Sequence, residues 1–97
     1  MGCIALTMSI REMARKQRLR YLAEELVEEA YNAANRYPPF NSAHEGFAVL
    51  QEEVDELWDE VKKSPKKREP EKMREEAIQT GAMALRFLFD CCTKEEK

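Results

Sequence analysis

Acidic side chains recur in this sequence at a spacing that places them on one face of a helix. Glu53 and Glu56 stand three residues apart, and Glu76 and Gln79 have the same spacing further along the chain. Residues three apart project from the same side of an α-helix. Two such pairs facing each other would form an oxygen-rich site for a hard divalent cation such as Mg²⁺. The alternative is that both pairs are ordinary acidic helix surface.

Three helices are predicted to carry these side chains. The first should begin near residue 10, after the capping box of Ser9 and Glu12, and end near residue 35, before Pro38 and Pro39. Its apolar residues recur at steps of three and four and form one stripe, made up of Leu19, Leu22, Leu26, Ala30 and Ala33. A second capping box, Ser42 to Glu45, predicts the next helix start at residue 42 or 43.

The second helix is expected to hold its carboxylates beside its apolar seam. That seam consists of Phe47, Leu50, Val54, Leu57 and Val61. At 100° per residue, Glu53, Glu56 and Glu60 lie next to it, where water is partly excluded. On the same helical wheel, Asp55 and Asp59 point toward solvent. The carboxylates that flank the seam are therefore the candidates for chemistry.

The third helix should run from about residue 71 to 92, after a basic linker at residues 64–70. Beyond Glu76 it is apolar nearly all round, which is typical of a helix buried on most sides. Gly81 and Ala84 would allow another helix to approach closely. Since three helices cannot cover this one, we expect an all-α helical bundle completed by dimerisation, as a homodimer or a higher homo-oligomer.

The 97-residue chain is predicted to form a single helical domain at residues 9–93, with a flexible lead-in at 1–8 and a frayed tail at 94–97. Met1 and Met8 are the two candidates for the start of translation. We find no signal peptide and no apolar run long enough to span a membrane, so we expect a cytoplasmic protein without membrane contact. The net charge of −3 is near balance. The basic segment at residues 11–20 is interpreted as a solvated helix start, and nucleic acid as an unlikely partner.

One segment resembles a known family. Residues 41–58, which include Glu52-Glu53-Val54-Asp55-Glu56, look like the MazG-like nucleotide pyrophosphohydrolases, particularly the short phage and prophage type. That family has a motif EExxE followed, after a gap, by ExxD. Here Glu76-Ala77-Ile78-Gln79 takes the place of the second half. The resemblance covers roughly residues 26–90.

The resemblance implies an all-α fold whose subunits pair into a helical bundle. It also implies Mg²⁺-dependent hydrolysis, with Mn²⁺ as a substitute, of a nucleoside triphosphate between its α and β phosphates. The products are a nucleoside monophosphate and pyrophosphate, and the role is nucleotide-pool cleaning. By motif position, Glu53, Glu56 and Glu76 are the catalytic metal ligands. Gln79 takes a ligand position, Glu52 supports the site, and Glu60 is an additional ligand.

Gln79 departs from the family pattern, in which Asp is expected. An amide oxygen can bind a hard cation but brings no charge, so the alternative function is a non-catalytic helical dimer that binds nucleotide, metal or a protein partner. Phe40, Asn41 and Asn35, near the first turn, are candidates for a base pocket. His44 and Trp58 lie away from the carboxylates, and Trp58 is expected to serve core or dimer packing.

Overall fold

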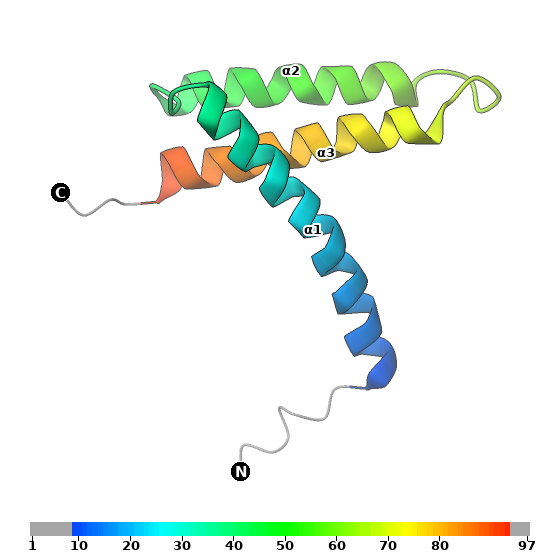
Figure 1. Ribbon diagram of the computed structural model, residues 1–97. Helices are drawn as coiled ribbons and strands as arrows, with labels where there is room; N and C mark the ends of the chain where they lie inside the picture. Colours follow the sequence, from blue (N-terminus) through cyan, green and yellow to red (C-terminus); the bar gives the residue numbers. More distant parts are fainter. Residues whose placement is uncertain (1–8, 94–97) are drawn as a thin grey trace, which may run out of the picture.

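Three α-helices make up the computed structural model, which describes residues 9–93 (Figure 1). They are α1 (Ile10–Arg36), α2 (Ala43–Val61) and α3 (Pro70–Phe87), and the π-helix η2 (Leu88–Cys92) follows α3 directly. These residues contain no strand, so the prediction of an all-α fold is confirmed. The predicted lead-in and tail, at 1–8 and 94–97, lie outside the described residues.

The helix starts are fixed by side chains that satisfy free backbone N–H groups. The Ser9 hydroxyl accepts a hydrogen bond from Glu12 N, and the Glu12 carboxylate accepts one from Ser9 N, each at 3.1 Å. This is the predicted capping box. At α2 the Ser42 hydroxyl accepts from Glu45 N at 3.1 Å, but the Glu45 carboxylate accepts from Asn41 N rather than from Ser42. The second capping box is therefore shifted by one residue on its carboxylate side.

The third helix differs from the predicted range of 71–92. It begins one residue earlier, at Pro70, whose fixed φ and missing N–H suit a first helical position. Its α-helical part ends at Phe87, and residues 88–92 form a wider π turn. Such turns interrupt regular α-helical geometry and are frequent near functional sites. Here the π turn carries Asp90, which contacts the loop between α1 and α2.

α3 is the central element, because it packs against both α1 and α2 (Figure 1). α2 and α3 run antiparallel and side by side, while α1 crosses α3 obliquely. The core is small and consists of Ala30, Ala33, Ala82 and Met83. A Cβ atom on Gly81 would lie 2.8 Å from Leu26 Cδ2, so the close approach expected at Gly81 is made by α1 of the same chain.

Large apolar side chains remain exposed on α1, α2 and η2. The predicted seam of α2 is only partly covered, since Phe47, Val54 and Trp58 are exposed while Leu50 and Leu57 are half-buried. The third helix, predicted to be buried on most sides beyond Glu76, is buried or half-buried from Ile78 to Phe87, but Ala77, Leu88 and Phe89 are exposed. Within residues 9–93, no helix is both long and apolar enough to cross a bilayer.

The α1–α3 contact at Gly81 provides a test of the fold. We expect Gly81→Val to lower the free energy of unfolding by about 1–3 kcal/mol, because its added carbons overpack the contact with Leu26. Ala77→Val, at an exposed position of α3, is the matched control and should cost no more than about 0.7 kcal/mol. Urea unfolding at one fixed protein concentration measures both. Equal losses for the two variants would contradict a tight contact at Gly81.

Candidate metal centre

α2 and α3 bring together the three carboxylates that the sequence singles out. One carboxylate oxygen from each of Glu53, Glu56 and Glu76 lies within 4.8 Å of the other two. The Thr80 hydroxyl fixes the helices at this level, because it lies 2.8 Å from the carbonyl oxygen of Glu76 and 3.2 Å from that of Glu53. Its single hydrogen is shared between these two carbonyl oxygens, so the Thr80 side chain links α3 to the backbone of α2 beside the three carboxylates, which we call the acidic triad.

The acidic triad is partly withdrawn from water. Glu53 and Glu76 are half-buried, Glu56 is exposed, and Glu76 Oε1 is a buried oxygen without a hydrogen-bond partner. Burial raises the pKa of Glu76, and the charge of Glu56 raises it further. Burial likewise raises the pKa of Glu53, with added repulsion from Glu56 and Glu76. Ionised carboxylates are therefore held together here against both desolvation and mutual repulsion.

The donor set fits a hard divalent cation. Mg²⁺ takes only oxygen ligands, at 2.0–2.1 Å, so two of its ligands lie up to about 4 Å apart. One oxygen of each triad carboxylate lies within 4.8 Å of the other two, so rotation of the side chains would have to bring them closer together around one ion. No group donates a hydrogen bond to the buried Glu76 Oε1, so this oxygen is available to bind a cation. Glu53, Glu56 and Glu76 are accordingly the residues that would hold the ion.

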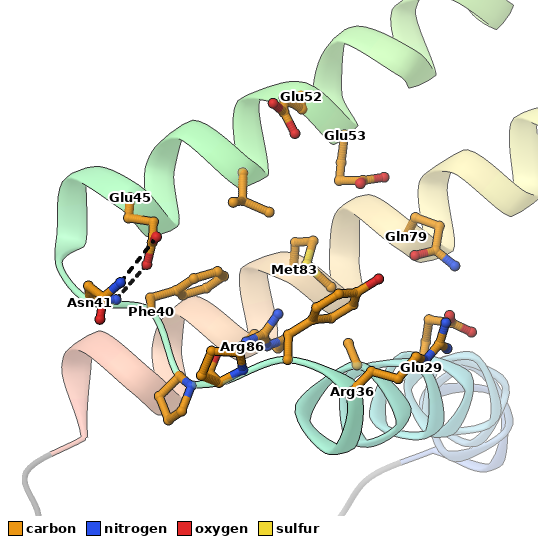
Figure 2. Close-up of a pocket in the computed structure, with 15 residues that line it drawn as sticks. Glu29, Arg36, Phe40, Asn41, Glu45, Glu52, Glu53, Gln79, Met83 and Arg86 are labelled. Atoms are coloured by element: carbon orange, nitrogen blue, oxygen red, sulfur yellow. Dashed lines mark hydrogen bonds between the residues drawn. The ribbon is translucent and has the colours of Figure 1, made fainter.

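The other predicted ligands lie in different surroundings. Glu52 and Gln79 line a cavity that begins at Glu53 (Figure 2). Glu60 is half-buried and accepts a hydrogen bond from Lys63 Nζ at 2.9 Å, so a cation of the chain already neutralises it. Glu60 still lies near enough for its charge to raise the pKa of Glu76. The structure thus groups three of the six predicted ligands into one cluster and places two beside it.

The cavity has a volume of about 500 Å³, within the range typical of ligand pockets. Glu53 and Gln79 lie at one end, and Phe40 and Asn41, two of the three candidate base-pocket residues, lie at the other (Figure 2). Asn35, the third, does not line it. The wall contributed by α3 is one helix face, because Gln79, Met83 and Arg86 follow Glu76 at steps of three, four and three.

Arg86 is a functional candidate that the sequence interpretation missed. It is 6% exposed, its guanidinium lies 4.4 Å from the centre of the Phe40 ring, and its Nη2 donates to the Pro38 carbonyl at 3.1 Å. Asp90 lies 3.6 Å from Arg86 Nη2 and accepts a hydrogen bond from Phe40 N at 3.1 Å. Arg86 and Asp90 therefore attach the loop that walls the cavity to the end of α3.

A sequence signal for Arg86 existed, since it is the single charged residue between Glu76 and Asp90. A buried charge is costly unless it is paired and hydrogen-bonded, so a lone Arg in an apolar helix indicates a specific partner. Glu29 and Arg36, which line the cavity from α1, carry no such signal. Their spacing within α1 is that of any solvated helix face, and only the crossing of α1 over α3 brings them to the cavity.

The acidic triad predicts how a divalent cation affects stability. Because Glu53 and Glu76 have raised pKa values, the folded state binds protons more tightly than the unfolded state, and stability falls as the pH rises through those values. At neutral pH, Glu76→Gln should therefore raise Tm in a metal-chelating buffer by several degrees, at about 4–8 °C per kcal/mol. Mg²⁺ or Mn²⁺ should raise the Tm of the wild type but not of this variant.

Glu75→Gln is the matched control, because it removes the same charge from the exposed neighbouring position of α3. Differential scanning calorimetry with and without the cation measures all three proteins. A metal-induced rise in Tm that is the same in Glu76→Gln as in the wild type would contradict the assignment of Glu76 as a ligand.

Comparison with known proteins supplies no further identification. Searches of the chain against protein-family models, curated proteins and solved structures found no match. The resemblance to MazG-like enzymes therefore rests on the motif residues, of which Glu53, Glu56 and Glu76 lie together and Gln79 lines the adjoining cavity. Function has to be argued from the acidic triad and the cavity themselves.

Proposed function

We propose that this protein is a divalent-metal-dependent nucleoside triphosphate pyrophosphohydrolase of the MazG-like type. One observation carries the proposal: the carboxylate oxygens of Glu53, Glu56 and Glu76 converge to within 4.8 Å, and Glu53 also lines the adjoining cavity. A ligand in that cavity would thus lie against a centre that binds a hard cation. Mg²⁺, when bound, neutralises phosphate charge and favours attack on phosphorus by water.

The residues of the cavity divide into an end for phosphates and an end for a nucleoside. The triad end suits a triphosphate, because a cation held by the carboxylates would also bind phosphate oxygens and offset their negative charge. The far end offers the aromatic rings of Tyr37 and Phe40, which have the flat apolar surfaces that a base stacks on, and the amide of Asn41. The volume of about 500 Å³ suits a small molecule and excludes a folded macromolecule.

Three carboxylates line the cavity outside the triad: Glu29, Glu45 and Glu52. Glu52 directly precedes Glu53 in α2 and lies beside it (Figure 2), whereas Glu45 accepts a hydrogen bond from Asn41 N, so Glu52 is assigned the proton transfer. In the proposed reaction, a water oxygen forms a bond to the α phosphorus, and the bond from that phosphorus to the α–β bridging oxygen breaks. The bridging oxygen leaves with the pyrophosphate, and Glu52 accepts the proton of the attacking water. General-base action of this kind typically contributes a factor of about 10²–10⁴ in rate.

Pyrophosphate release tests this function directly. We expect turnover of a nucleoside or deoxynucleoside triphosphate with Mg²⁺ or Mn²⁺, and a loss of about 10²-fold or more in kcat/KM for Glu53→Gln, because its carboxylate both binds the ion and lines the cavity. Asp55→Asn is the matched control, since it neutralises an exposed carboxylate of the same helix outside the triad. Absence of turnover across the triphosphate panel, or equal activity of the two variants, would refute the proposal.

A second candidate function is supported by Gln79, which lines the cavity where the family pattern has an acid. If the chain has kept the cavity but lost the charge needed for turnover, it binds nucleotide and metal without hydrolysis. A neutral amide beside three carboxylates also lowers the attraction for a cation relative to a fourth carboxylate.

Gln79→Asp separates the two functions. In either case we expect the variant to bind Mn²⁺ more tightly, by about tenfold, since one added charge at a partly buried site contributes on the order of 1–2 kcal/mol. Isothermal titration calorimetry measures the affinity, and pyrophosphate release measures turnover. Hydrolysis that appears only in Gln79→Asp supports the binding function, whereas robust hydrolysis by the wild type rules it out.

A further inference from the structure

The N-terminal half of α1 stands free of the helical pair formed by α2 and α3. Every residue from 10 to 24 is exposed although the segment is fully helical, and Figure 1 shows it extending away from the other helices. We call this segment, residues 10–24, the arm. Isolated helices of about 12–15 residues are marginally stable in water, so a partner that covers the arm would stabilise it.

The arm continues the apolar stripe that packs α1 onto α3. Leu26, Ala30 and Ala33 contact or face α3, and the same stripe extends to Leu22 and Leu19 beyond the end of that contact. Leu19 is 65% exposed and Leu22 is 45% exposed. The stripe is therefore covered at its C-terminal end and uncovered along the arm.

α2 presents a second uncovered apolar stripe. Phe47, Val54 and Trp58 follow one another at steps of seven and four, so they share one side of the helix, and they are 59%, 40% and 57% exposed. We call them the outer stripe. It spans about 17 Å of helix and the arm about 22 Å, at 1.5 Å per residue, so the arm is long enough to cover it.

The charges of the two surfaces are opposite. The arm has five basic residues and two acidic ones: Arg11, Arg15, Lys16, Arg18 and Arg20 against Glu12 and Glu24. α2 has seven acidic residues and neither Lys nor Arg: Glu45, Glu52, Glu53, Asp55, Glu56, Asp59 and Glu60. Pairing α2 with another α2 would oppose seven acids to seven, whereas the arm brings basic side chains to the outer stripe.

We propose that the arm of one copy of this chain packs lengthwise on the outer stripe of a second copy, and that the exchange is reciprocal. The arm cannot fold back onto its own α2, because α1 is a single helix from Ile10 to Arg36 and has no Gly or Pro at which it could bend. Leu19 and Leu22 would meet Phe47 and Trp58, and Arg15, Lys16 and Arg18 would lie among the acids of α2. This interface is independent of the proposed catalytic function.

Complementary charge reversal tests the exchange. One full-length variant carries Arg15→Glu, Lys16→Glu and Arg18→Glu in the arm, and the other carries Gln51→Lys, Asp55→Lys and Asp59→Lys beside the outer stripe. Sedimentation velocity should show a dimer for the wild type and a shift toward monomer for each variant alone. An equimolar mixture should recover dimers, because the substituted acidic positions of one arm then face the substituted basic positions beside the outer stripe of the other copy, and the unchanged arm faces the unchanged α2.

Two further measurements identify what the mixture contains. Differently labelled variants should form heterodimers, and the emission of Trp58, the only tryptophan, should move to shorter wavelength as the arm covers it. The matched control for the arm variant carries Lys66→Glu, Lys67→Glu and Lys72→Glu. It has the same change in net charge as the arm variant, at exposed positions outside both surfaces, and should remain dimeric. Circular dichroism confirms that each variant is folded.

Four outcomes would overturn the proposal. They are a monomeric wild type, a wild-type dimer that neither charge reversal weakens, a mixture of folded variants that stays monomeric, and a control that dissociates as fully as the arm variant. The third outcome would point to a different partner for the arm, and the fourth to a general effect of net charge.

Discussion

Repulsion among like charges is the constraint around which this small helical protein is built. α2 and α3 hold Glu53, Glu56 and Glu76 within a few ångströms of one another, and two of these carboxylates are half-buried. Such an arrangement costs free energy at neutral pH unless a cation offsets it. The half-buried apolar contacts of α2 and the hydroxyl of Thr80 have to oppose this repulsion. The packing of α2 against α3 thus holds the carboxylates close together although they repel one another.

α3 joins every functional feature of the molecule, because one of its faces runs from the acidic triad to the loop. Glu76, Gln79, Met83 and Arg86 lie along that face in order, so its character changes from anionic through amide and apolar to cationic over about ten residues. Asp90, 3.6 Å from Arg86 Nη2, offsets the charge of the guanidinium, so the uncompensated charge of the face lies at the triad end. A ligand that is charged at one end and has a flat ring at the other suits such a face better than a symmetrical ligand does.

Local sequence signals predicted the helices and the triad, whereas features that depend on tertiary placement were missed or altered. Caps and apolar periodicity act within a few residues, so the starts of α1 and α2 followed from local sequence. The spacing of Glu53 and Glu56 places them on one face of α2, whereas the approach of Glu76 was expected from the two-part acid motif and not from any local signal. Glu60, predicted as an additional ligand, accepts a hydrogen bond from Lys63, a local pair three residues apart that the prediction did not consider. The contributions of Glu29 and Arg36 from α1 arise from a helix crossing that no local pattern encodes.

The attachment of the loop to α3 has a mechanical consequence. Arg86 and Asp90 hold the loop at the Pro38 carbonyl and the Phe40 amide, so the loop wall of the cavity moves with the C-terminal end of α3. The same helix carries Glu76, ten residues before Arg86. α3 therefore connects one member of the acidic triad to the loop. A tilt of α3 relative to α2 would move Glu76 away from Glu53 and Glu56 and would carry the loop wall of the cavity with it.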